Sequence, residues 1–172
     1  PLRSRMTDTL IFSPFSSQSS QGNSVTALRL ERILKPTGLE VVLDSGTITA
    51  TKSRCLVALN ARRSADVIAD FKNSNPESQI VIILTGTDIN HPDAGLAGSA
   101  TWKSMEMADR LVLLHEGSRA LVPQPFHSKC KVIYPSVSLP EGIVHRPKDN
   151  GFAILMAGNM RKEKNPQLAR AA

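Results

Sequence analysis

The sequence predicts an α/β protein built on a doubly wound parallel sheet. Short aliphatic runs alternate along the chain with segments of helical periodicity, the pattern of parallel strands joined by helices. Apolar residues make up 41% of the chain and aromatic residues only 4%, so a core would consist of Leu, Ile, Val and Ala. Strands buried on both faces of a parallel sheet have this aliphatic composition. We therefore expect a Rossmann-like domain.

Aliphatic runs mark six candidate strands. The first, TLIFS, precedes a turn rich in Ser and Gln at residues 14–22, and the most apolar is IVIIL. The polar, β-branched stretch 47–53 stays unassigned. The predicted strands are residues 9–13, 39–43, 55–59, 80–84, 110–114 and 131–134.

Helical signals lie between these runs. Asn23 is the expected N-cap of the first helix, which Pro36 and Gly38 end, and Ser64 is the expected cap of the second. The apolar face of the first helix is predicted to consist of Val25, Leu28, Leu30, Ile33 and Leu34. The predicted helices are residues 24–34, 65–72, 102–108 and 117–121.

The last part of the chain predicts a second domain. Residues 135–150 contain three prolines and no periodicity, which is typical of a linker. Residues 151–172 then combine an apolar run, a glycine, a basic loop and a helix start, the unit with which α/β proteins hold phosphates. We therefore expect an amino-terminal Rossmann-like domain at 1–134, an interdomain linker at 135–150, and the first strand, loop and helix of a truncated second domain at 151–172.

Charge and composition indicate the class of ligand. The formal net charge is +6, but the 21 basic residues are scattered and do not alternate with aromatic ones, so phosphorylated small molecules fit better than nucleic acid.

Cys55 and Cys130 lack the spacing of metal ligands, and a reducing cytoplasm is their simplest context. No apolar run approaches the length of a membrane span, and the amino end lacks the apolar core of a secretory signal. The histidines also lack ligand spacing; they are His91, His115, His127 and His145.

The candidate binding residues follow the first and third strands. Ligands of doubly wound sheets bind beyond the carboxyl ends of the strands. Gly22 and Asn23, at the start of a helix, can present backbone N–H groups to an anion. Arg62 and Arg63 can bind a phosphate through paired hydrogen bonds. An ordinary helix cap and a solvated arginine pair explain the same residues without a ligand.

The loop after the fourth strand carries the candidate catalytic residues. Thr85 and Thr87 offer hydroxyls, Gly86 permits a tight turn, and Asp88 can orient a hydroxyl or accept a proton. An Asx turn is the structural alternative. The loop continues to residue 98 and is long enough to be functional or mobile.

Several segments together resemble a known family. GNSVTALRLERIL, LVALNARRS and LTGTD follow one another as in the selenosugar synthases of selenoneine biosynthesis, which are glycosyltransferase-like enzymes related to the family 4 glycosyltransferases. ADRLVLL, KVIYPS and GNMRKEKNP extend the resemblance over nearly the whole chain. It implies a GT-B architecture, in which the amino-terminal domain serves the acceptor and the carboxyl-terminal domain holds the nucleotide sugar. It also implies the reaction: selenophosphate attacks the sugar of UDP-N-acetylglucosamine, UDP leaves, and neither a metal nor a further cofactor takes part.

The resemblance also implies residue roles. Lys164 stands in the place of the family's phosphate-binding lysine, with Gly158 and Arg161 on the same donor loop. The acceptor anion would be bound by Gly22, Asn23, Arg62, Arg63 and Thr85. Asp88 and Thr87 would face the cleft as the catalytic candidates.

Two departures and a missing segment keep other functions open. Asn60 and Asn159 stand where the family is expected to have His, and an amide can carry neither a proton nor a charge. Most of the donor domain is absent, so we expect the chain to be inactive alone. An ordinary glycosyltransferase with a hydroxyl acceptor and a non-catalytic nucleotide- or phosphate-binding fragment are the alternatives.

Overall fold

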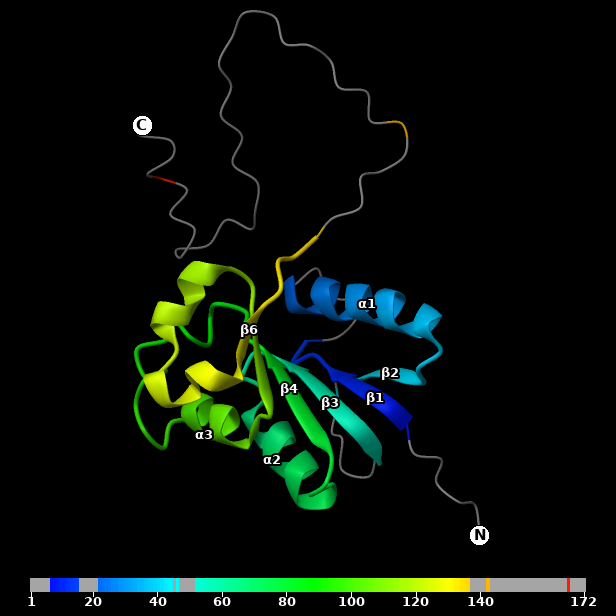
Figure 1. Ribbon diagram of the computed structural model, residues 1–172, viewed down its shortest axis with the longest axis horizontal. Coiled ribbons are helices and arrows are strands. Elements are labelled where there is room, and N and C mark those ends of the chain that lie inside the picture. Colours follow the sequence, from blue (N-terminus) through cyan, green and yellow to red (C-terminus); the bar gives the residue numbers. More distant parts are fainter. Residues whose placement is uncertain are drawn as a thin grey trace, which may run out of the picture. The chain divides into compact units, whose positions relative to one another are not determined.

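The computed structural model describes residues 7–15, 22–44, 46, 52–136, 142 and 167. Within this part of the chain, six strands form one parallel sheet in the order β2-β1-β3-β4-β5-β6 (Figure 1). The strands are β1 (Thr7–Phe12), β2 (Val41–Asp44), β3 (Ser53–Leu59), β4 (Gln79–Ile83), β5 (Arg110–Leu113) and β6 (Cys130–Val132). The predicted α/β class and the parallel sheet are confirmed, and the architecture is consistent with a Rossmann-like fold.

All six predicted strands are present, with ends that differ by one or two residues. The strand β3 begins earlier than predicted, at Ser53, because Ser53 pairs with Thr7 of β1. Part of the stretch that the sequence left unassigned therefore belongs to a strand, while residues 47–51 lie outside the described residues. The compact unit that contains the sheet ends at Ser136.

The helices connect the strands. Their bounds are α1 (Gly22–Leu34), η1 (Lys35–Thr37), α2 (Ala65–Ser74), α3 (Ala100–Met107), η2 (Glu116–Leu121) and η3 (Gln124–Lys129). The sequence did not predict η1 or η3. Gly38 ends η1 in the left-handed conformation, with φ of 85°, as expected for a glycine after a helix. No helix among the described residues combines the length and the apolar character needed to cross a membrane.

One predicted cap was wrong, and the other is confirmed in its position but makes no side-chain capping bond. The helix α1 begins at Gly22, so Asn23 lies inside the first turn rather than before it. Ser64 does precede α2, but its hydroxyl donates a hydrogen bond of 2.6 Å to the carbonyl of Leu59 and does not cap the helix. Ser99 does cap a helix, since its Oγ accepts a hydrogen bond of 3.2 Å from the N–H of Trp102 at the start of α3.

The predicted apolar face of α1 was also partly wrong. Val25 and Ile33 are 58% and 52% exposed, whereas Ser24 and Ala27 are fully buried. Small side chains at this spacing allow the helix to approach the sheet closely, and the longer side chains further along α1 pack at its margin. The face toward the sheet is therefore chosen by size as well as by hydropathy.

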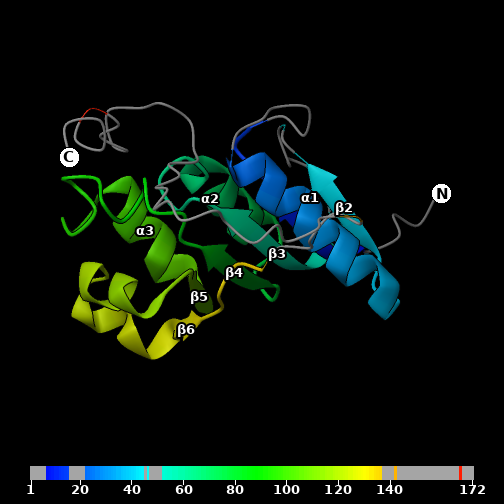
Figure 2. The same cartoon turned by 90° about the horizontal axis from the view of Figure 1, so that it is seen from above.

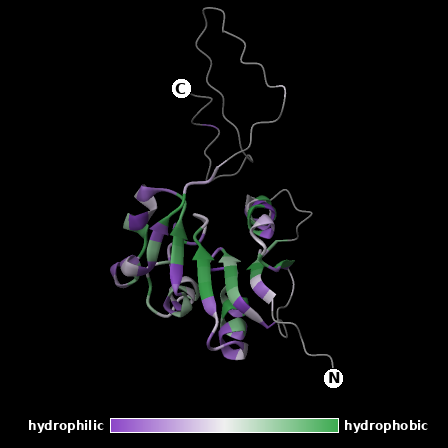
Figure 3. Ribbon diagram, turned by 45° about the vertical axis from the view of Figure 1, so that its right-hand side comes forward, coloured by the Kyte–Doolittle hydropathy of each residue, from purple (hydrophilic) through white to green (hydrophobic). Residues whose placement is uncertain are grey.

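The sheet separates two hydrophobic clusters. Successive strand residues point to opposite faces, so Ile82 belongs to one cluster and Ile83 to the other. The helices α2 and α3 and the turn η3 cover the first face, while α1 packs against β1 and β2 on the second (Figures 1 and 2). Figure 3 shows the strands as the most apolar part of the molecule, as expected for a sheet with helices on both faces.

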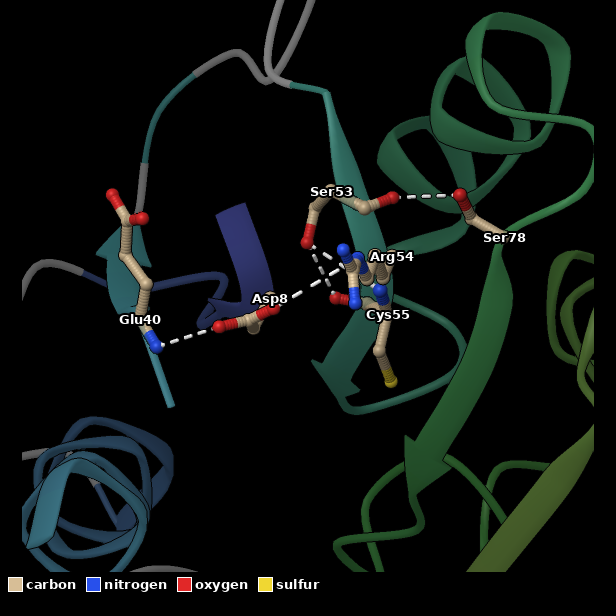
Figure 4. A network of polar contacts seen from close by, with 6 residues as sticks. All are labelled: Asp8, Glu40, Ser53, Arg54, Cys55 and Ser78. Carbon is tan, nitrogen blue, oxygen red and sulfur yellow. Dashed lines mark hydrogen bonds and ion pairs between the residues drawn. The ribbon is translucent and has the colours of Figure 1, made fainter. Parts of the chain in front are cut away.

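Polar contacts hold the amino ends of four strands together (Figure 4). The carboxylate of Asp8 in β1 accepts a hydrogen bond from the N–H of Glu40, just before β2, at 3.0 Å and lies 3.9 Å from Nε of Arg54 in β3. The hydroxyl of Ser78, before β4, donates to the carbonyl of Ser53 at 2.6 Å. These contacts support the register of the sheet at the edge opposite to the candidate site.

Lys129 stabilises the carboxyl end of α3. Its ammonium donates hydrogen bonds to the carbonyls of Met105 and Glu106, at 3.0 and 2.9 Å, and lies 5.8 Å from the ring centre of Phe126. A cation at a helix carboxyl end also interacts favourably with the helix dipole. Burial lowers the pKa of Lys129, so desolvation offsets part of this gain.

We expect Lys129→Met to lower the free energy of unfolding by about 1–2 kcal/mol, because two helix-end carbonyls lose a charged donor. Urea unfolding followed by circular dichroism measures the change. Lys103→Met is the matched control, since Lys103 is an exposed lysine of α3, the helix whose carboxyl end Lys129 contacts. Equal stability of the two variants would contradict the capping role of Lys129.

Candidate functional site at the carboxyl edge of the sheet

The site lies where the chain changes direction across the sheet. Strand β1 has β2 on one side and β3 on the other. The connection after β1 runs through α1 on one face, and the connection after β3 runs through α2 on the other (Figure 1). Loops that leave two neighbouring parallel strands toward opposite faces create the position at which such folds bind ligands.

Phe15 brings the loops after β1 and β3 together. Its carbonyl accepts a hydrogen bond of 3.3 Å from the hydroxyl of Ser24, in the first turn of α1. The guanidinium carbon of Arg63 lies 5.1 Å from the centre of the Phe15 ring, a cation–π distance. Phe15 therefore contacts both the first turn of α1 and Arg63, which are separated by some forty residues of sequence.

This arrangement unites two predicted groups of anion-binding residues. Gly22 and Asn23 lie in the first turn of α1, where backbone N–H groups have no partner within the helix. Arg62 and Arg63 are exposed at the amino end of α2. No ion pair with a described carboxylate involves either arginine. The charge of both arginines is thus available to a ligand.

Asn60 joins the loop after β3 to the loop after β4. Its Nδ2 donates hydrogen bonds to the hydroxyls of Thr85 and Thr87, at 2.9 and 2.8 Å, and its Oδ1 accepts one from the N–H of Arg63 at 3.0 Å. The residue is 1% exposed and has a φ of 69°, in the left-handed region that Asn tolerates better than most residues. The amide therefore fixes the backbone that carries Arg63 relative to both threonines.

Asp88 is a buried carboxylate and does not face a cleft, so that expectation was wrong. Its oxygens accept hydrogen bonds from the N–H groups of Ala61, Thr85 and Ile89, at 2.9, 3.1 and 3.0 Å, and its side chain is 0% exposed. Burial raises the pKa of Asp88, although these backbone hydrogen bonds act in the opposite direction. Its contacts are those of a residue that holds two loops together.

A serine from α3 supports the same backbone. The hydroxyl of Ser104, which is fully buried, lies 2.7 Å from the carbonyl of Ala61 and 2.9 Å from that of Ala100. Together with the bond from Ser64 to Leu59, it orders the residues on either side of Arg62. The arginines are exposed, but the chain that presents them is held by buried contacts.

Thr87 is the exposed member of the predicted catalytic pair. Its hydroxyl accepts the hydrogen bond from Asn60 and keeps its own proton for another acceptor. Thr85, predicted to bind the anion, is half-buried beside it. The roles of both threonines and of Asp88 in catalysis stay predictions.

The predicted donor loop lies outside the described residues. This concerns Gly158, Arg161 and Lys164, together with Asn159.

Among the described residues, no group of three or more His, Cys, Asp or Glu side chains could hold a metal ion. Both cysteines are free, and burial raises the pKa of each thiol, so neither Cys55 nor Cys130 is a ready thiolate nucleophile.

Sequence reasoning missed the two residues that organise the site. Phe15 lies in a turn of low-complexity composition, and its contact with Arg63 depends on strand order, which no local pattern reveals. Asn60 was considered only for the imidazole that it lacks. An Asn directly after a strand and before a helix is a signal for left-handed backbone, and this signal could have identified it.

Comparisons with known proteins identify no family, because neither a protein-family model nor a curated protein sequence matches the chain.

Proposed function

We propose that this chain is the amino-terminal portion of a glycosyltransferase-like selenosugar synthase with GT-B architecture. The enzyme would join selenophosphate to the sugar of UDP-N-acetylglucosamine and release UDP. The observation that best supports the proposal is the meeting of Arg63 with the first turn of α1 at Phe15, at the crossover between β1 and β3. The order of the family-like segments along the chain supports it independently.

The acceptor anion would bind at this crossover. Selenophosphate is small and highly charged, so it needs cationic and N–H donors that are fixed in place. Arg63 and Arg62 would supply the charge, and Gly22 and Asn23 the backbone N–H groups of a helix amino end. Asn60 would position Arg63 through the bond from its N–H.

The donor would be held by the loop after the strand predicted in residues 152–157. Departure of UDP concentrates negative charge on the diphosphate, which Lys164 and Arg161 would stabilise, while Gly158 would let the backbone approach the phosphates. Selenium is a strong nucleophile and needs little help from a base. Thr87 would then orient a substrate hydroxyl, and Asp88 would keep the two acceptor loops in register.

The test is UDP release from UDP-N-acetylglucosamine with and without selenophosphate, on a polypeptide that carries a complete donor domain. We expect release that requires selenophosphate. Arg63→Ala should raise the KM for selenophosphate about tenfold or more, because a charge-assisted hydrogen bond contributes roughly 1.5–3 kcal/mol. Arg110→Ala is the control, since Arg110 is exposed at the amino end of β5, on the opposite edge of the sheet.

Each contrary result has a defined meaning. UDP release at the same rate with and without selenophosphate would reject the selenosugar synthase assignment and favour a glycosyltransferase with a hydroxyl acceptor. Donor binding with no release would favour a nucleotide-binding module. Unchanged donor turnover in Lys164→Ala would show that the donor loop is assigned to the wrong residues.

A further inference from the structure

A cavity of about 260 Å³ lies between α1 and the carboxyl ends of β1 and β2. In the register of the sheet Asp44, the last residue of β2, is the partner of Phe12, and its carbonyl accepts the N–H of Ser13 at 3.0 Å. The cavity therefore opens at the same edge of the sheet as Arg63. Its lining residues are Ser13, Phe15, Ser24, Ala27, Leu28, Glu31, Leu43 and Asp44.

Two carboxylates line this cavity, one from a strand and one from a helix. Asp44 comes from β2, and its Oδ1 accepts a hydrogen bond from the N–H of Gly46 at 2.7 Å. Glu31 comes from α1, and its Oε1 lies 2.8 Å from the ammonium of Lys35, with 21% of the side chain exposed. In the described part of the chain, the second oxygen of each carboxylate has no protein partner. In each carboxylate, the bonded oxygen fixes the side chain, and the second oxygen is left as an acceptor for a ligand.

The remaining walls combine buried hydroxyls with apolar surface. Ser13 is 1% exposed, and its Oγ accepts a long bond of 3.4 Å from the N–H of Phe15. Leu28 and Leu43 supply aliphatic surface, and Phe15 an aromatic ring. Acceptors on two walls, with apolar surface between them, suit a ring that carries hydroxyls on its edge and C–H groups on its faces. They oppose a phosphate inside the cavity, because two carboxylates would repel it.

Phe15 connects the cavity to the anion site. It lines the cavity and at the same time carries the guanidinium of Arg63 over its ring. A ligand with a hydroxylated ring and an attached phosphate could therefore place its ring against Asp44 and Glu31 and its phosphate toward Arg63. The two parts of such a ligand match the charges of the two neighbouring positions.

We propose that this cavity binds the ring of a phosphorylated monosaccharide, with its hydroxyls donating to Asp44 and Glu31 and its phosphate bound by Arg63. The proposal rests on the proposed function for the anion position and adds the class of ligand. In that reaction, the C–O bond to UDP breaks as the C–Se bond forms, so the first product is itself a sugar joined through selenium to a phosphate. The cavity would hold the sugar of that product.

Isothermal titration of the 172-residue chain with three probes tests the inference. The probes are glucose 1-phosphate, phenyl phosphate, which has a ring without hydroxyls, and inorganic phosphate. We expect glucose 1-phosphate to bind at least tenfold more tightly than either of the others. Asp44→Asn should remove this preference and leave the affinity for inorganic phosphate unchanged, because Asn keeps the acceptor for Gly46 but replaces the second oxygen, the one offered to a sugar hydroxyl, by an uncharged NH2 group.

Matched variants separate the two sites. Asp70→Asn, at an exposed position of α2 on the other face of the sheet, should change nothing. Arg63→Ala should weaken all three probes. Equal affinity for glucose 1-phosphate and inorganic phosphate would overturn the cavity proposal and leave the anion site standing. Preference for glucose 1-phosphate that survives Arg63→Ala but not Asp44→Asn would support the cavity and reject the anion site.

Discussion

Replacing Asp88 by Asn is expected to destabilise the protein by about 2–4 kcal/mol at neutral pH, because one of its two acceptor oxygens becomes an NH2 group that faces backbone N–H groups. Asp88 accepts hydrogen bonds from Ala61, Thr85 and Ile89, which belong to two different loops. The Asn side chain has nearly the same size, so the loss measures hydrogen bonding rather than packing. Urea unfolding followed by circular dichroism provides the free energies.

The same pair of proteins reports on the charge of Asp88. Burial raises its pKa above the ordinary value of 3.8. A carboxyl whose pKa is higher in the folded than in the unfolded state contributes stability below the unfolded pKa and loses it as the pH rises through the folded pKa. The difference in stability between the wild type and Asp88→Asn should therefore shrink as the pH is increased from about 4 toward 8, since Asn does not titrate.

The control for this effect is an exposed carboxylate. Asp70→Asn should change the free energy of unfolding only slightly, because Asp70 is exposed on α2. A difference between the wild type and Asp88→Asn that grows with pH would mean that the backbone N–H groups hold the pKa of Asp88 below its ordinary value. Desolvation would then be the weaker of the two opposing effects.

The sheet could be predicted because its signal is local. The composition of aliphatic runs such as IVIIL indicates strands that are buried on both faces. Each of the six runs corresponds to a strand of the structure. The face of α1 could not be read in the same way. Its inward residues, Ser24 and Ala27, were selected by the distance between helix and sheet, which hydropathy does not encode.

In the candidate site, too, some residues could be predicted from local sequence, and others could be identified only from the fold. Arg62 and Arg63 were found because two cations at the amino end of a helix oppose its dipole unless an anion offsets them. The partner of Arg63, Phe15, depends on β1 and β3 being neighbours, with β2 on the outer side. Strand order is a property of the whole sheet, so a contact across it can be proposed only after the topology is known. Asp44 was missed for the same reason, since a single acidic residue becomes part of a cavity only when α1 covers it.

Replacing Asn60 by Ala is expected to lower the free energy of unfolding by about 3 kcal/mol or more. Roughly 1–2 kcal/mol comes from placing Ala in the left-handed region, where Asn60 has a φ of 69°. The remainder comes from the loss of three hydrogen bonds at a residue that is 1% exposed, with the N–H of Arg63 left without its acceptor. Thermal and urea unfolding of both proteins measure the change.

Two further variants separate these contributions. Asn60→Gly loses the same hydrogen bonds but accepts the left-handed backbone, so it should be more stable than Asn60→Ala by about 1 kcal/mol. Asn60→Asp keeps the acceptor for Arg63 and presents oxygens to the hydroxyls of Thr85 and Thr87, which can rotate to donate. It should therefore be the mildest of the three near neutral pH. If Asn60→Ala and Asn60→Gly were equally stable, the strain of the left-handed backbone would be no larger than the extra conformational entropy that Gly loses on folding. The amide network would then be the main reason why this position holds Asn.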